Sequence, residues 1–135
     1  MPTARIWSDV EVEASPQVKI VFDDIRASRG TDFVNNFWRS LANQPALLER
    51  TWGLVKSVMV TTGVLDPLFK EMIYIAVSTV NGCGYCVHSH SSAARSRGMT
   101  DDQYGELLAV IATAMETNAL VSALQTPVDP EFQAS

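Results

Sequence analysis

Residues 71–97 read EMIYIAVSTVNGCGYCVHSHSSAARSR, and this stretch decides the fold that the sequence predicts. An apolar helix is expected over residues 67–80, because Asp66–Pro67 is typical of a helix start. Asn81–Gly82 is expected to end that helix. Helical spacing resumes over residues 83–97, which are followed by another glycine. The stretch therefore predicts two helices joined by a tight turn.

Outside this stretch, Pro, Gly, Asn and Asp separate further helical segments, and strand signals are almost absent. Helices are expected over residues 16–29, 32–42 and 45–62. The last helix opens at Thr100 with a capping-box pattern, Thr-Asp-Asp-Gln. We therefore predict an all-α fold, a compact bundle of about six helices.

A chain of 135 residues is expected to form one domain. We assign an extended N-terminal arm to residues 1–15, a helical domain to residues 16–125 and a C-terminal tail to residues 126–135. The arm is expected to lie on the body of the protein or on a neighbouring subunit. The tail holds two prolines, which disfavour a continuing helix.

The composition restricts the partners and the location of the protein. Forty-seven per cent of the residues are hydrophobic, the net charge is −5 and the pI is about 4.8. An acidic chain without a dense basic stretch is unsuited to nucleic acid and to anionic membrane surfaces. We found no uninterrupted apolar run of the roughly 18 to 20 residues that span a bilayer. The N-terminus lacks the apolar core of a signal peptide, so we expect a cytoplasmic protein.

The two cysteines, Cys83 and Cys86, lie three positions apart. A structural disulfide closing so short a loop would constrain the unfolded chain little. In a reducing compartment such a pair is more often redox-active or metal-binding. The spacing therefore points to chemistry rather than to a structural crosslink.

Helix geometry selects one of the two histidines as a partner for the sulfurs. Successive helical residues turn by about 100°, so Cys86 lies about 60° from Cys83 and His90 about 20° from it. His88 falls about 140° away and is expected at the surface. The start of a helix favours a thiolate, and an imidazole four residues after Cys86 can exchange a proton with its thiol. We therefore predict a site formed by Cys83, Cys86 and His90.

Glu71 is the one carboxylate in the apolar helix that precedes the cysteines. A helix that is apolar on nearly every side is usually buried, and a buried carboxylate needs a partner. Because the turn at Asn81–Gly82 folds this helix back, Glu71 is expected to approach the face that carries Cys86 and His90. The competing interpretation is a purely structural ion pair, for example with an arginine.

These residues together resemble a known family. The combination of Glu71, Asn81-Gly82-Cys83-Gly84-Tyr85-Cys86, His90 and Arg95 or Arg97 is similar to the core motif of the alkylhydroperoxidase D-like family, which is related to carboxymuconolactone decarboxylases. The resemblance extends over most of the chain, including the segments at residues 36–42, 45–48 and 63–66. It implies an all-helical protein that forms a homo-oligomer, commonly a trimer or hexamer.

The resemblance also implies thiol-dependent peroxidase activity with no cofactor and no metal. Carried over to this chain, it makes Cys86 the residue that attacks the hydroperoxide and Cys83 the resolving residue. Glu71 and His90 are then the proton relay, and a thiol reductant or partner redox protein restores the dithiol. The decarboxylase branch generally lacks the cysteine pair, so lactone decarboxylation is disfavoured.

The chain departs from the family motif at one position, and several alternative functions and sites remain open. Peroxidase members carry a second histidine between the cysteines, where this chain has Tyr85, whose phenol is a poor proton shuttle at neutral pH. A thiol–disulfide carrier for a partner peroxidase and a non-redox oligomeric binding protein are therefore alternative functions. Thioredoxin-type reasoning makes Cys83 the attacking thiolate. A zinc site would have only Cys83, Cys86, His90 and Glu71 as ligands.

Overall fold

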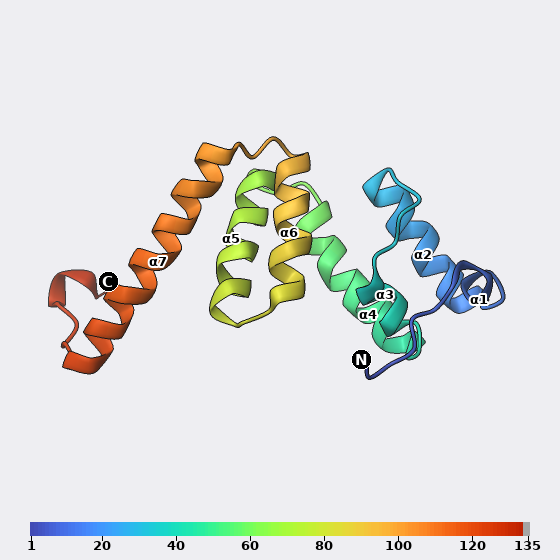
Figure 1. The fold of residues 1–135 in the computed structure, drawn as a ribbon, viewed down its shortest axis with the longest axis horizontal. Helices are drawn as coiled ribbons and strands as arrows, with labels where there is room; N and C mark the ends of the chain where they lie inside the picture. Colours follow the sequence, from blue (N-terminus) through green and yellow to red (C-terminus); the bar gives the residue numbers. More distant parts are fainter. Residues whose placement is uncertain (134–135) are drawn as a thin grey trace. The chain divides into compact units, whose positions relative to one another are not determined.

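The computed structural model describes residues 1–133, and these form seven α-helices and no strand (Figure 1). The all-α prediction is confirmed. The helices are α1 (Asp9–Glu13), α2 (Pro16–Arg29), α3 (Asn36–Leu41), α4 (Pro45–Val55), α5 (Pro67–Val80), α6 (Gly84–Ser96) and α7 (Asp101–Leu124). A π-helical turn (Lys56–Val60) continues α4, and a short 3-10 turn (Pro130–Phe132) lies in the tail.

The chain divides into two compact units, residues 1–63 and the part from Val64 onward. The boundary at Gly63 falls inside residues 16–125, for which the sequence predicts a single helical domain. Each unit has its own cluster of buried apolar side chains. The predicted tail extends to residue 135, and its last two positions lie outside the described residues.

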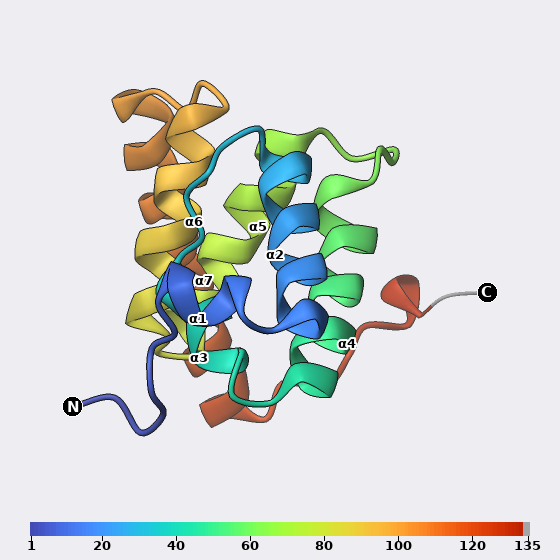
Figure 2. The same cartoon turned by 90° about the vertical axis from the view of Figure 1, so that its right-hand side faces the viewer.

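The first unit buries an aromatic core between α2 and α4, which lie side by side (Figure 2). Its fully buried side chains include those of Val18, Phe22, Ile25, Trp38 and Leu48. Trp52 is also buried and donates its indole N–H to Asp24 Oδ2 at 2.7 Å. Hydrogen bonds from Lys56 and Trp52 hold the pKa of Asp24 below its usual value. The hydrogen bond from Trp52 to Asp24 thus joins α2 to α4 through two residues that lie 28 positions apart in the sequence.

The expectation of an extended arm over residues 1–15 is wrong for residues 9–13, which form α1. Ser8 and Glu11 make a reciprocal capping box: Glu11 N donates to Ser8 Oγ, and Ser8 N donates to Glu11 Oε2 at 2.8 Å. Val12 is buried and joins the core of the first unit. A capping box and one buried valine are enough to stabilise this short helix against α2.

The second unit is built on the antiparallel pair of α5 and α6, coloured yellow-green and gold in Figure 1. Both helices begin and end close to the predicted residues, and α7 starts at the predicted capping box of Thr100 and Gln103. The buried core of this unit consists of Ile75, Ala94, Met99 and Ile111. The pair positions every residue of the predicted site.

The turn between α5 and α6 is a Schellman motif. Cys83 N donates to Ser78 O at 2.9 Å and Gly82 N donates to Thr79 O at 3.1 Å. Gly82 has φ +69°, in the left-handed region that glycine tolerates. Cys83, the residue after it, is the N-cap of α6. One turn therefore ends α5 and fixes the first cysteine at the start of the next helix.

Much apolar surface of the second unit is exposed. Phe69, Ile73, Val77 and Val80 of α5 are all more than half exposed, so the expectation that this helix is buried on every side is wrong for the single chain. Along α7 only Ile111 is buried. By length and composition α7 is apolar enough to cross a membrane, which the short apolar runs of the sequence had not indicated. These exposed faces need an explanation.

We expect Gly82→Ala to lower the free energy of unfolding by roughly 1 kcal/mol, because an L side chain is strained at positive φ. No atom outside the turn lies within 4 Å of the added Cβ, so the effect isolates backbone strain. Gly84→Ala is the matched control, since Gly84 is a helical position that is equally open. Urea unfolding of the oxidised proteins measures both. Equal stabilities for the two variants would contradict the role of the turn.

Candidate redox site

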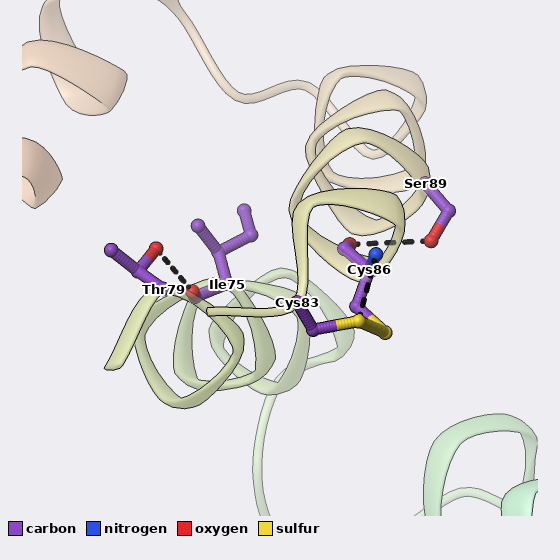
Figure 3. The surroundings of a disulfide bond; sticks show 5 residues. All are labelled: Ile75, Thr79, Cys83, Cys86 and Ser89. Carbon is purple, nitrogen blue, oxygen red and sulfur yellow. Dashed lines mark hydrogen bonds between the residues drawn. A yellow bond between two sulfur atoms is a disulfide. The ribbon is translucent and has the colours of Figure 1, made fainter. Parts of the chain in front are cut away.

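Cys83 and Cys86 form a disulfide at the N-terminal end of α6, with their Cα atoms 5.3 Å apart (Figure 3). Both residues are half-buried. Figure 3 shows the sulfurs turned away from the side chains of Ile75 and Thr79 on α5. The pair is therefore neither packed in an apolar interior nor held apart, and a small oxidant or a thiol can approach it.

The backbone of α6 places a hydrogen-bond donor at the first sulfur. As N-cap, Cys83 accepts a hydrogen bond at Sγ from Cys86 N, at 3.3 Å. The amides of a first helical turn have no partner within the helix and carry partial positive charge. An anionic sulfur at this position is favoured over a neutral one. Cys83 is thus suited to leave as a thiolate when the disulfide is reduced.

Glu71 and His90 form the second pair of the predicted site. His90 Nδ1 lies 2.7 Å from Glu71 Oε2, so the hydrogen bond joins α5 to α6. Only 5% of Glu71 is exposed, and the His90 side chain is 21% exposed. The expectation that a buried Glu71 requires a partner is therefore met by the predicted histidine.

Two further residues contact this second pair. Arg97 Nε lies 3.6 Å from Glu71 Oε1, so an arginine also reaches the carboxylate, as the structural interpretation had allowed. The ring of Tyr74 stacks on the imidazole of His90. Tyr74 is not among the residues that the sequence predicts for the site. Its position three residues after Glu71, on the same face of a helix, was the available signal.

The structure thus brings the four predicted residues together as two pairs on one helical hairpin. Cys86 and His90 lie about one helical turn apart on α6, which is about 6 Å along the helix axis. His88 is exposed, and Arg95 pairs with Asp101 at 2.7 Å, as expected for surface residues. Within residues 1–133, no group of three or more His, Cys, Asp or Glu residues is arranged to hold a metal ion.

Known proteins show what this arrangement is similar to. The crystal structure of an alkylhydroperoxidase AhpD core from Rhodospirillum rubrum superposes on this chain with a TM-score of 0.98 and a sequence identity of 61%. The match covers 100% of this chain and 99% of that protein. An alkyl hydroperoxide reductase AhpD from Gluconacetobacter diazotrophicus is 30% identical over 132 residues, which are 94% of this chain and 65% of that protein.

Other relatives match shorter parts. The alkyl hydroperoxide reductase AhpD of Solibacter usitatus is 37% identical over 65 residues, 48% of this chain and 35% of the relative. That of Mycobacteroides abscessus is 40% identical over 75 residues, 53% of this chain and 42% of the relative. The chain therefore spans less than two thirds of the length of these curated relatives.

The model of the carboxymuconolactone decarboxylase family matches residues 45–127, which include α5, α6, α7 and the whole candidate site. The match covers more than half of the chain. The resemblance drawn from the sequence is confirmed, and the chain belongs to the carboxymuconolactone decarboxylase family.

Proposed function

We propose that the protein reduces hydroperoxides through its Cys83–Cys86 pair. The observation that carries this proposal is the half-buried disulfide at the start of α6, on the same hairpin as a hydrogen-bonded Glu71–His90 pair. A disulfide shows that the two sulfurs reach each other without rearrangement of the backbone. The names of the similar proteins support the same chemistry.

The reaction proceeds in three balanced steps. The Cys86 thiolate attacks the distal oxygen of a hydroperoxide; the O–O bond breaks, the sulfur becomes a sulfenic acid, and the alkoxide takes a proton and leaves as an alcohol. The Cys83 thiol then condenses with the sulfenic acid, which forms the disulfide and releases water. An external dithiol, either a small thiol reductant or a partner redox protein, reduces the disulfide and is itself oxidised.

Glu71 and His90 serve as the proton relay in this proposal. A carboxylate that accepts a hydrogen bond from Nδ1–H leaves Nε2 as the basic nitrogen of a neutral imidazole. Nε2 accepts the proton of the Cys86 thiol and returns it to the leaving alkoxide. Arg97 also lies 3.6 Å from this carboxylate and offsets its negative charge.

A second candidate is a thiol–disulfide carrier that passes electrons to a partner peroxidase. Tyr85 favours it, because this residue stands between the cysteines where a second relay histidine is expected, and 47% of it is exposed. The carrier uses the same disulfide but reacts with a partner protein rather than with a peroxide. We propose a cytoplasmic location for either function, where reductants maintain such a pair.

We also propose that the protein acts as a homo-oligomer, a trimer or hexamer, in which another copy covers α7. The exposed apolar residues of α7 include Leu108, Val110, Met115, Leu120, Val121 and Leu124. They continue into a pocket of about 310 Å³ that α5 also lines. So large an apolar surface is characteristic of an interface.

A second copy of the chain accounts for the exposed apolar residues of α7 better than a membrane does. Glu116 and Asn118 are both exposed within the apolar part of the helix. Placing a carboxylate at the centre of a bilayer costs about 2.5 kcal/mol or more. Where carboxylates do occur in transmembrane helices, they face other protein groups and not lipid. An interface between copies can instead leave such side chains at its solvated rim.

We expect Cys86→Ser to abolish hydroperoxide consumption by the reduced protein. Cys83→Ser is expected to consume about one equivalent and to stop at the sulfenic acid, because no resolving thiol is present. Peroxide remaining in solution is measured after addition of about two equivalents of cumene hydroperoxide. Consumption by Cys86→Ser equal to that of the unsubstituted protein would refute the assignment, and negligible consumption by all three proteins would favour the carrier.

We expect His90→Gln and Glu71→Gln each to slow oxidation of the dithiol by about 100-fold, within the range for loss of a general acid–base group. His88→Gln is the matched control, since His88 is exposed on the same helix and is expected to have no effect. Stopped-flow mixing with hydroperoxide, followed by quenching and thiol counting, gives the rates. Equal effects of His90→Gln and His88→Gln would rule out the relay.

We expect Val110→Asp to dissociate the oligomer, because it places a charge in the apolar surface of α7. Asp102→Asn, at the polar start of the same helix, is expected to leave assembly intact. Sedimentation velocity gives the mass of each species. A monomeric unsubstituted protein would contradict the proposal, as would flotation of that protein with phosphatidylcholine vesicles.

A further inference from the structure

Tyr74 makes the closest aromatic contact of the site, and none of the steps above uses it. Its ring centroid lies 3.6 Å from that of His90, and the two ring planes are inclined by 20°. Tyr74 is on α5, three residues after Glu71, so the two residues are neighbours on one face of that helix. One helix therefore supplies both the hydrogen-bond partner of the imidazole edge and the stacking partner of its face.

The two contacts restrict different motions of the imidazole. The 2.7 Å hydrogen bond to Glu71 fixes the position of Nδ1, but the ring can still rotate about that bond. The χ2 torsion of histidine has a broad preference and does not by itself fix the ring plane. A stacked tyrosine blocks rotation out of its own plane. With both contacts present, the direction of Nε2 is determined.

We propose that Tyr74 is a positioning residue for His90: its ring holds the imidazole plane so that Nε2 keeps one direction while Nδ1 remains on Glu71. Tyr74 acts through His90 and does not touch the reacting atoms. The inference rests on the relay role proposed for His90. It assigns the effect to the aromatic ring of Tyr74 and not to its hydroxyl group.

Two variants separate the ring from the hydroxyl group. Tyr74→Phe keeps the stacked ring, and Tyr74→Leu removes it at similar apolar bulk. The first readout is the NMR signals of the histidine ring protons, because a stacked aromatic ring shifts them upfield. The chain has only two histidines, so exposed His88 on the same helix serves as an internal reference. We expect the His90 signals to be displaced in the unsubstituted protein and in Tyr74→Phe but not in Tyr74→Leu.

The second readout is the rate at which iodoacetamide alkylates Cys86 in the reduced protein, mapped by mass spectrometry. This reaction needs no peroxide, so it decides the role of Tyr74 even if the protein proves to be a carrier. We expect Tyr74→Leu to react about two- to tenfold more slowly, the range that corresponds to one aromatic contact, and Tyr74→Phe to react within about twofold of the unsubstituted protein.

Three results would overturn the inference. The first is a rate for Tyr74→Phe as low as that of Tyr74→Leu, which would assign the effect to the hydroxyl group. The second is displaced His90 signals in Tyr74→Leu, which would show that the stack does not set the ring plane. The third is an unchanged alkylation rate in Tyr74→Leu, which would show that the ring plane does not matter to Cys86.

Discussion

The hydrogen bond between Glu71 and His90 is the interaction on which the rest of the site depends. A carboxylate with 5% exposure has lost nearly all of its water and must be paired inside the protein. Its partners are His90 of α6, at 2.7 Å, and Arg97, the C-cap residue of that helix, at 3.6 Å. The bond therefore joins α6 to α5 and holds Nδ1 of the imidazole at the carboxylate. The same contact satisfies the buried carboxylate and joins the two residues for which we propose a proton relay.

The turn at Gly82 complements this bond at the other end of the hairpin. It reverses the chain within three residues and leaves Cys83 as the N-cap of α6. The disulfide therefore lies at the positive end of a helix, one turn before His90. The turn and the Glu71–His90 pair both lie within the second unit, which has its own buried core.

The sequence predicted the parts of the molecule that local rules govern. The capping box at Thr100, the prolines that open α2, α4 and α5, and the Asn81–Gly82 turn each fixed a helix end. Helical spacing also selected His90 rather than His88. The helix α1 was missed although Ser8 and Glu11 carry the same capping signal as Thr100 and Gln103, because the segment is short. The stacking of Tyr74 on His90 depends on how α5 and α6 face each other. The spacing of residues within a single helix does not determine this. The same is true of the exposed apolar residues of α7. Their helical spacing predicts a helix but does not identify the surface that packs against it.

All of the proposed chemistry takes place at the two sulfurs. Intact-protein and peptide mass spectrometry of the reduced protein, before and after one equivalent of hydroperoxide, shows whether they react. We expect a loss of two hydrogens, located at residues 83 and 86. An unchanged mass, or oxidation found only at methionine residues, would contradict it.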